Sequence, residues 1–543
     1  MERAKIEDVL RQYLPHDLRY KISPVHGILI LIRNYLCSRE PIYGVGEWAG
    51  RIAPDLLALK AGDIPHLNDD RVGRCLDRLF ESDCASIVLA VVVHVIKEFK
   101  VSLEELHNDS TTITFCGRYE GAGEQGTWRG KIVHAITWGH NKDHRPDLKQ
   151  LLYNLTVSAD GAVPMHFFTG NGNLTDDQTH RETWDLLRKL KGSVDFLYVA
   201  DAKLATKENM GYIAGEGGRF ITVLPQSRNE CKDFRKLVTR QAITWTKAWE
   251  KKNDEGFVED VYSIAGHPAT TAEGYRLIWF HSSRKAELDE MSRNDRLQRG
   301  LRALALLRQK LQSPRTRYRQ EARVREAVDK RLGPLSVDHL IHVEIKMTNE
   351  ERFRQARRGR PSKNTKYHRD VRTKFDLEYK IDPIKIAEDA QQDGIFPLVT
   401  NDRKLPDIEV LHAYKRQPLL EKRFEQLKTD FEVAPVYLKT RRRIEALLCV
   451  YFFALLVQAL VERELRRAMD REGLSELPLY PEGRPCRAPT TRRIVDFFEN
   501  IQRHELVTRH GQKEILVTEL SPPQKTVIEL LGMQETTYGR DFV

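Results

Sequence analysis

The spacing of apolar residues changes near residue 105. Before that point it follows a helical period and predicts helices at 6–14, 25–36, 55–59, 69–80 and 85–99. Arg71, Arg74 and Arg78 share one face of the fourth of these helices. Together with a short helix at 45–52, it would form a helix-turn-helix that presents arginines to DNA. A helical bundle whose basic face is solvated accounts for the pattern equally well.

From residue 106 the apolar residues alternate as in β-strands. Strands are predicted at 108–115, 151–157, 163–168, 196–200 and 220–224, with a polar loop at 140–150 and a helix from a capping box at 175–178 to about 190. Asp109 lies at the start of the first strand, and Asp201 directly follows the strand 196–200. An aspartate beside a strand is usually a turn former or a helix cap, so neither residue alone indicates a site.

The stretch 231–400 contains two strongly basic segments. A long helix from 284 to about 330 carries Arg293, Arg296 and Arg299 opposite an apolar stripe. Residues 352–374 are predicted to be turn-rich, and in them Arg358 and Arg360 flank a glycine before a proline. Such an element can lie extended in a narrow minor groove of DNA, and an exposed linker fits as well. Strands are predicted again at 375–381 and 394–401.

A predicted helix at 414–428 has an unusual polar face. Tyr414, Gln417, Glu421 and Lys428 recur at offsets of 3, 4 and 7, close to one helical face beside an apolar stripe. A surface helix with ion pairs is the ordinary explanation. The following segment 440–469 is predicted to be a core helix, because its apolar centre is shorter than the roughly 20 residues that span a bilayer. We therefore expect no membrane partner.

The charge balance narrows the class of partner. The 543 residues include 88 Lys and Arg against 78 Asp and Glu, a net charge of +10, which favours a polyanion, nucleic acid before a membrane. At this length several domains are expected. Seven cysteines without metal-ligand spacing argue against a zinc module or a disulfide framework and suit a reducing cytosol. The charged N-terminus lacks the apolar run of a signal peptide.

Three of the residues above are carboxylates that a sheet-and-helix fold could bring together: Asp109, Asp201 and Glu421. Converging carboxylates repel one another unless a cation neutralises them, and oxygen donors select Mg²⁺ or Mn²⁺. Two such ions can activate an attacking oxygen and stabilise the leaving oxygen of a phosphoryl displacement. The sequence therefore predicts a two-ion site at these three residues.

With these residues the chain resembles the insertion-sequence DDE transposases that carry a Tyr-x2-Arg-x3-Glu-x6-Lys signature. The resemblance lies in NDSTTITF around Asp109, FLYVADAKLATKENM around Asp201, and the stretch 414–428. The segments GNGNLTDDQT at 170–179 and DGIFPLVTN at 393–401 are also similar, and the resemblance covers about 108–465. One position departs from it: the signature arginine is Gln417 here, which has no charge to offer a phosphate.

The resemblance implies an α/β (α+β) fold with a ribonuclease H-like catalytic core interrupted by a large insertion. Together with the helical pattern before it, the predicted division is a helical DNA-binding domain at 1–105, the core at 106–230 and 401–475 with the Glu421 helix in its second part, the insertion at 231–400, and a C-terminal tail at 476–543. Contacts to DNA are expected at Tyr414, Gln417, Lys428, Arg358, Arg360, Arg293, Arg296 and Arg299.

The activity implied is cleavage at transposon ends and strand transfer into target DNA. The implied partners are double-stranded DNA, as the element's terminal inverted repeats and as target, and a second copy of the chain in a homodimer. The implied location is the cytoplasm of a prokaryote, at the nucleoid. Two alternatives remain open from the residues: a DNA-binding regulator or decayed transposase without catalysis, and a general DNA nuclease with the same core.

Overall fold

The computed structural model describes residues 1–15, 20–253, 256–313, 315–430, 438–507, 509 and 513–533. The chain forms two compact units: unit 1 is Met1–Val223 with Val399–Val543, and unit 2 is Leu224–Leu398. The stretch predicted as an insertion, 231–400, falls almost entirely within unit 2. The N-terminal helices belong to the same compact unit as the segments predicted to form the core.

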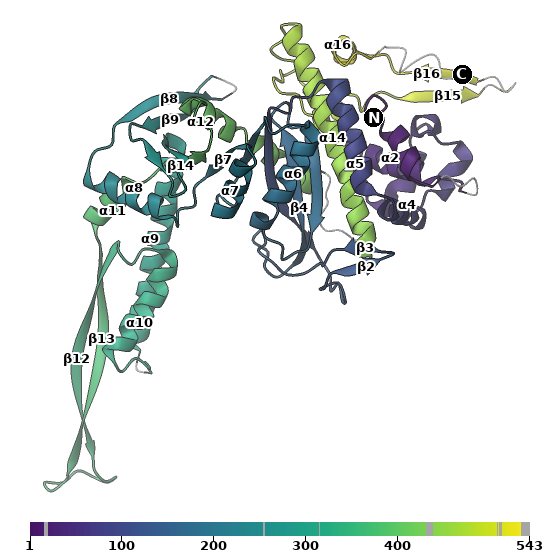
Figure 1. Ribbon diagram of the computed structural model, residues 1–543. Helices are drawn as coiled ribbons and strands as arrows, with labels where there is room; N and C mark the ends of the chain where they lie inside the picture. Colours follow the sequence, from purple (N-terminus) through teal and green to yellow (C-terminus); the bar gives the residue numbers. More distant parts are fainter. Residues whose placement is uncertain are drawn as a thin grey trace. The chain divides into compact units, whose positions relative to one another are not determined.

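Unit 1 is built on a mixed sheet with the strand order β5-β4-β1-β6-β7 (Figure 1). Its strands are β1 (Glu105–Phe115), β4 (Lys149–Ser158), β5 (Pro164–Gly170), β6 (Leu197–Ala200) and β7 (Arg219–Val223). β1 is antiparallel to β4 and parallel to β6, and β6 is parallel to β7. The parallel pairs require crossovers, which α6 (His180–Lys191) and α7 (Lys207–Gly215) supply. All five strands lie where the sequence predicts them, and the fold is mixed α/β.

A bundle of helices packs around one long central helix, α14 (Arg441–Arg471). The bundle contains α1 (Ile6–Tyr13), α2 (Pro24–Cys37), η1 (Ile42–Gly44), α3 (Val45–Gly50), η2 (Pro54–Leu57), η3 (Ala61–His66), α4 (Asp69–Glu81) and α5 (Cys84–Phe99). The helix α14 contacts α2, α4 and β5. It is long and apolar enough to cross a membrane, but 89% of its most apolar window is buried inside the protein. The pair α4 and α5 passes the same test only if its 85° bend is ignored.

The stretch predicted only as a C-terminal tail contains regular structure. It contains α15 (Thr491–Phe497), α16 (Pro522–Leu530) and a hairpin of β15 (Arg503–Val507) with β16 (Lys513–Val517). Leu465 and Met469 of α14 form a small core with Ile494 and Val527 from α15 and α16. A few apolar residues at helical spacing are enough to dock the short helices on α14, and such a sparse signal is easily overlooked.

Unit 2 begins with α8 (Asn229–Arg240) and an antiparallel set of strands, β8 (Trp245–Lys252), β9 (Val258–Ala265) and β11 (Arg276–Ser282), with β10 (Ala269–Thr270) against β11. The predicted long helix is two helices, α9 (Ser283–Gln312) and α10 (Glu321–Leu332), followed by η5 (Gly333–Leu335). The helix ends before Pro314 because a proline disfavours the helical conformation at the residue that precedes it, and Ser313 is extended. Beyond the arm described next, α11 (Pro383–Ala390) and β14 (Ile395–Thr400) complete the order.

The segment predicted to be turn-rich, 352–374, has turns only at 356–366, and its two ends belong to a two-stranded arm that includes the predicted strand 375–381. β12 (Ile341–Gln355) pairs with β13 (Tyr367–Ile381) along its whole length, from Ile341 opposite Ile381 to Gln355 opposite Tyr367 (Figure 1). The rest of the arm was not predicted because both faces of the outer ribbon are exposed, which leaves no apolar alternation to recognise.

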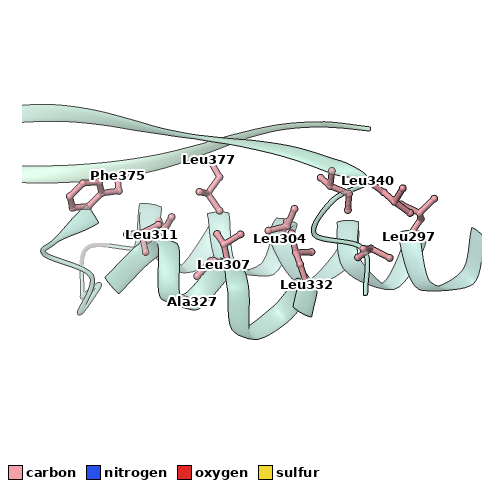
Figure 2. Close-up of a cluster of buried hydrophobic side chains, with 13 residues drawn as sticks. Leu297, Leu304, Leu307, Leu311, Ala327, Leu332, Leu340, Phe375 and Leu377 are labelled. Carbon is pink, nitrogen blue, oxygen red and sulfur yellow. The ribbon is translucent and has the colours of Figure 1, made fainter. Parts of the chain in front are cut away.

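The root of the arm is fixed by a hydrophobic core. Leu304, Leu307 and Leu311 of α9 pack with Leu332 of α10 and Leu377 of β13 (Figure 2). These leucines are almost fully buried. Burial of several leucines at about 1.5–3 kcal/mol each attaches the arm to the helices, so its exposed outer part needs no core of its own.

The predicted helix at 414–428 is interrupted. It consists of α12 (Asp407–Lys415), α13 (Pro418–Glu425) and a π-helical turn, η6 (Gln426–Asp430). Pro418 has no backbone N–H and cannot continue the hydrogen-bond ladder of α12, but it suits the first turn of a new helix. Tyr414 and Glu421 therefore lie on different helices and do not share one regular face, as the offsets suggested.

Glu445 of α14 is a buried acid whose environment makes stability depend on pH. Its Oε1 accepts a hydrogen bond of 2.8 Å from the backbone N–H of His134, and burial raises its pKa from 4.5 to about 7. Between these two pH values the Glu445 carboxyl is ionised in the unfolded chain and still protonated in the folded one. The free energy of unfolding should therefore fall as the pH rises from about 4.5 to about 7, by at most about 3 kcal/mol from this group.

The substitution Glu445→Gln removes this titration. We expect the variant to be more stable than the unchanged protein near pH 8, by about 1–3 kcal/mol in urea unfolding, and the difference to shrink near pH 5. Glu472→Gln, at the exposed end of α14, serves as the control and should leave the pH dependence unchanged. Equal pH profiles for Glu445→Gln and the unchanged protein would show that Glu445 does not titrate in this range.

Candidate active site

Three aspartates converge at one edge of the unit 1 sheet. Asp109 lies in β1, Asp201 directly follows β6, and Asp176 begins the short turn η4 (Asp176–Gln178) after β5. One carboxylate oxygen of each lies within 4.8 Å of the other two, and within the described ranges no other such acidic, His or Cys group occurs. Asn108 pairs with Ala200 in the parallel β1–β6 ladder, so the next residues, Asp109 and Asp201, lie side by side.

Short hydrogen bonds hold the three carboxylates in place. Asp109 Oδ1 accepts from the backbone N–H of Ser110 at 2.7 Å, and the Ser110 hydroxyl donates to Asp176 Oδ1. Asp201 Oδ1 accepts from the backbone N–H of Lys203 at 2.9 Å. Its carbonyl accepts from the hydroxyl of Thr222 on β7, at 2.6 Å. The group is therefore preorganised by its own backbone and by the neighbouring strand.

The cluster is electrostatically strained. Burial raises the pKa of Asp109 to about 6, and the charge of Asp201 adds to the increase while Lys142 opposes it. Burial also raises the pKa of Asp201, and the charge of Asp176 raises it further. Carboxylates in this state gain free energy from any cation that can reach them.

Lys142, from the loop between β3 (Lys131–Val133) and β4, places an ammonium among these oxygens. Its Nζ lies 3.1 Å from Asp109 Oδ1 and 2.9 Å from Asp176 Oδ2, and it donates to the carbonyl of Ser110 at 2.6 Å. Burial lowers the pKa of Lys142, but the two aspartates more than offset that, so the net direction is upward. This cation occupies part of the space where a metal ion would bind the same oxygens.

The sequence analysis missed both Asp176 and Lys142. Asp176 was predicted only as part of a helix start, but Thr175 makes no side-chain cap and Asp176 is 8% exposed. The signal that could have found it is the segment GNGNLTDDQT, although its spacing does not distinguish Asp176 from Asp177. Lys142 lies in a polar loop whose sequence gives no comparable signal. Lys428 holds that loop through an ion pair of 2.5 Å with Asp143.

Contacts along β1 fix the position of α13, which carries Glu421. Arg416 donates two bonds of 2.6 Å to Glu105 at the start of β1. The next residue, Gln417, is 3.0 Å from His107 Nδ1 and donates to the carbonyl of Asn108 at 3.4 Å. The helix and the strand therefore advance in the same direction, and the turn after Gln417 lies along the part of β1 that contains Asp109.

Glu421 itself is exposed and lies outside the group of three aspartates. Its charge nevertheless acts on the same side chain, Tyr414, as the charges of Asp201 and Asp109. Burial raises the pKa of Tyr414 to about 12, and the charges of Asp201, Glu421 and Asp109 contribute in that order. Glu421 therefore borders the site rather than completing its inner oxygen cluster.

A buried ion pair anchors α13 from its other side. Arg423 lies 2.9 Å from Glu462 of α14, and the two side chains are 3% and 2% exposed. The same guanidinium donates to the carbonyls of Gly161 and Ala162 in the β4–β5 turn, each at 3.0 Å. One arginine thus ties the helix of Glu421 to the sheet and to the central helix.

The side chains predicted to contact DNA differ in their exposure to solvent. Gln417 is buried in its bonds to β1, and Arg293 is buried in an ion pair of 2.6 Å with Asp393. Arg296 is half-buried, and Tyr414 and Lys428 are also half-buried at the edge of the aspartate site.

The more exposed predicted contacts all lie in unit 2. Arg299 is on the surface of α9, 3.3 Å from Asp295. Arg358 and Arg360 are exposed in the turn that joins the two strands of the arm. These three side chains are accessible to a phosphate backbone.

Comparison with known proteins gives limited matches. A family model described as a domain of unknown function (DUF4277) matches residues 1–93, and no curated protein matches the chain. Among solved structures, the chain is similar to a piggyBac transposase synaptic complex with hairpin DNA, with 10% identity and a TM-score of 0.26. That alignment covers 52% of this chain and 60% of the other, less than two thirds of its length. The family match covers the helices α1 to α4 and the first part of α5, and it leaves all three aspartates outside.

Proposed function

We propose that this protein is a DNA transposase that cleaves transposon ends and joins them to target DNA with Mg²⁺ or Mn²⁺. The observation that carries the proposal is the cluster of Asp109 in β1, Asp201 directly after the neighbouring strand β6, and Asp176 in the turn that follows β5. The motifs around Asp109 and Asp201, which resemble those of DDE transposases with a ribonuclease H-like core, support it. The surplus of basic residues supports a nucleic acid as the substrate.

The donor set suits hard divalent cations. Three carboxylate oxygens within 4.8 Å of one another are ligands of the kind that Mg²⁺ and Mn²⁺ prefer. The ammonium of Lys142 already shows that the site accepts a positive charge between Asp109 and Asp176. When bound, two such ions would supply charge stabilisation for the attacking and leaving oxygens of a phosphoryl displacement.

Each carboxylate and lysine of the site has its own proposed role. Asp109 and Asp201 belong to neighbouring parallel strands and form the rigid part of the site. Asp176 closes it from a loop. Glu421, on the helix beside β1, is the proposed fourth carboxylate and would help to hold a second ion. Lys142 lies among the inner oxygens, and Lys428 is paired with Asp143 in the same loop. The ammonium groups of both could bind backbone phosphates of the DNA.

The arm is the proposed DNA-binding surface of unit 2. Between positions 352 and 372 it carries nine Lys or Arg and one acid, Asp370. Phe353 and Tyr367 are 62% and 51% exposed beside these charges. A two-stranded ribbon of 15 residues a strand extends about 50 Å, and such ribbons fit the major groove. The inverted repeats of an element imply two copies of the chain, and we propose a homodimer on DNA.

Removal of the inner carboxylates should abolish cleavage. With a plasmid that carries the gene and its flanking DNA, Asp109→Ala, Asp176→Ala and Asp201→Ala should each lower Mg²⁺-dependent strand cleavage at least a hundredfold and leave DNA binding unchanged. Asp177→Ala, the neighbour in η4, is the matched control and should cleave normally.

Three results would count against this assignment. Full cleavage by Asp109→Ala would remove the proposed site. Binding without any metal-dependent cleavage by the unchanged protein would favour a regulator. Equal cleavage of an unrelated plasmid would favour a general nuclease.

Glu421 and Glu425 offer a matched pair, since both are exposed on α13. We expect Glu421→Gln to lower cleavage at least tenfold and Glu425→Gln to have little effect, because only Glu421 acts on Tyr414 together with the aspartates. Cleavage rates at several Mn²⁺ concentrations provide the readout. If both variants cleave as the unchanged protein does, Asp176 takes the place of Glu421 as the third acid.

Replacement of the arginines at the tip of the arm by neutral residues should weaken DNA binding and make the affinity less sensitive to salt. Replacement of Arg357, Arg358 and Arg360 by Ala should lower the slope of log K against log salt by roughly 2–3, if each arginine neutralises one phosphate. Arg299→Ala with Arg302→Ala on α9 is the comparison variant. An unchanged slope for the tip variant would show that the arm does not contact DNA.

A further inference from the structure

A pocket of about 260 Å³ lies in unit 1, formed by residues of α4, the hairpin of β2 (Gly126–Trp128) and β3, and the start of α14. It shares no lining residue with the aspartate site. Five arginines line it, against two carboxylates: Arg71, Arg74, Arg78, Arg129 and Arg442, with Asp77 and Glu81. The lining therefore has three more positive than negative groups.

The two carboxylates are fully engaged. Asp77 bonds Arg442 at 2.8 Å and also binds Arg443. Glu81 lies 2.8 Å from both Arg78 and Arg129. These pairs fix the walls of the pocket and spread the positive charge around its mouth.

Two arginines have no acidic partner in the part of the chain that the structure describes. Arg74 is exposed and makes no ion pair there. Arg71 lies 4.5 Å from the centre of the Tyr20 ring and donates only to the backbone carbonyl of Ile22. Guanidinium groups without a carboxylate partner are suited to bind phosphate with two parallel hydrogen bonds.

An aromatic ring stands at the other side of the same pocket. Trp128 is 39% exposed, and the guanidinium of Arg442 lies over its ring at 4.3 Å from the centre. Arg129 lies 6.0 Å from that centre. An exposed indole next to guanidinium planes offers a stacking surface that accepts any nucleobase.

We propose that this pocket binds one unpaired nucleotide, with its base on Trp128 and its phosphate at Arg71 and Arg74. The volume limits the ligand to one nucleotide at most, because it lies below the roughly 300–1,000 Å³ of sites that bury a whole drug-sized ligand, and a duplex is far wider. The pocket offers both arginines for an anion and an indole ring for stacking. A nucleotide uses both, whereas a simple inorganic anion would use only the arginines. The proposal rests on the proposed function only in naming a DNA strand as the source of the nucleotide.

Binding is measured by fluorescence anisotropy with the full chain in EDTA, so that cleavage plays no part. The probes are a labelled single-stranded oligothymidylate and a blunt duplex, with dTMP, thymidine and inorganic phosphate as competitors. Trp128→Ala should weaken binding of the single strand about tenfold or more and change duplex binding little. Arg74→Ala should weaken it several-fold and reduce the salt slope by about one.

Matched controls separate the pocket from general effects. Trp138 is also exposed, at 58%, and has Lys149 over its ring at 4.9 Å, but it does not line the pocket. Trp138→Ala and Arg51→Ala should bind as the unchanged protein does; Arg51 is an exposed arginine directly after α3 (Val45–Gly50). Trp128→Phe retains an aromatic ring and should recover most of the affinity, which tests stacking even if Trp128→Ala is less stable.

The outcomes are distinct. Competition by dTMP that is lost in Trp128→Ala supports the pocket and shows that a free nucleotide suffices, whereas competition by oligonucleotide alone supports a strand as the source. Equal competition by inorganic phosphate and dTMP overturns the proposal, since the base would then contribute nothing. Equal losses with Trp128→Ala and Trp138→Ala, or on duplex and single strand, also overturn it. A failure of metal-dependent cleavage with these results intact would refute only the transposase assignment.

Discussion

The mutual repulsion of three carboxylates is the constraint on which the site depends. Two unit charges 4 Å apart repel by about 4 kcal/mol at the effective dielectric of a protein surface, so Asp109, Asp176 and Asp201 need a compensating cation. In this structure Lys142 provides one for two of them. Burial raises the pKa of Asp109, Lys142 opposes that increase, and the charge of Asp201 adds to it. A site arranged in this way is poised to bind further positive charge.

Contacts with the surrounding strands and helices hold the three carboxylates close together despite their repulsion. The β1–β6 register sets the spacing of Asp109 and Asp201, and the contacts of Arg416 and Gln417 with β1 set the helix that carries Glu421. α14 joins the parts, because it forms a buried ion pair with Arg423 and also contacts α4 through Arg442 and Arg443. The helices that match a domain of unknown function and the sheet with the aspartates therefore share one core.

Local pattern predicted much of unit 1, and tertiary contacts explain what it missed. The strands around Asp109 and Asp201 were predicted because buried strands have a strong apolar signal. Asp176 was missed because a 3₁₀ turn between a strand and a helix has no period, and only the fold brings it to the other two. Of the arm, only the turn and the strand 375–381 were predicted, because the exposed outer ribbon has no alternation of apolar and polar residues. Pro418 interrupts a helix whose polar offsets had suggested one face. Gln417, the position that departs from the signature, has a role that only the structure shows, as a buried bridge to β1.

The central claim is that the three aspartates bind a divalent cation. The most direct test is the anomalous scattering of Mn²⁺ in crystals of the full chain. The account predicts an anomalous peak coordinated by oxygens of Asp109, Asp176 and Asp201, with the ammonium of Lys142 displaced from its position between the first two. A map with no peak at these residues at saturating Mn²⁺, and with Lys142 still bound to Asp109 and Asp176, would contradict it.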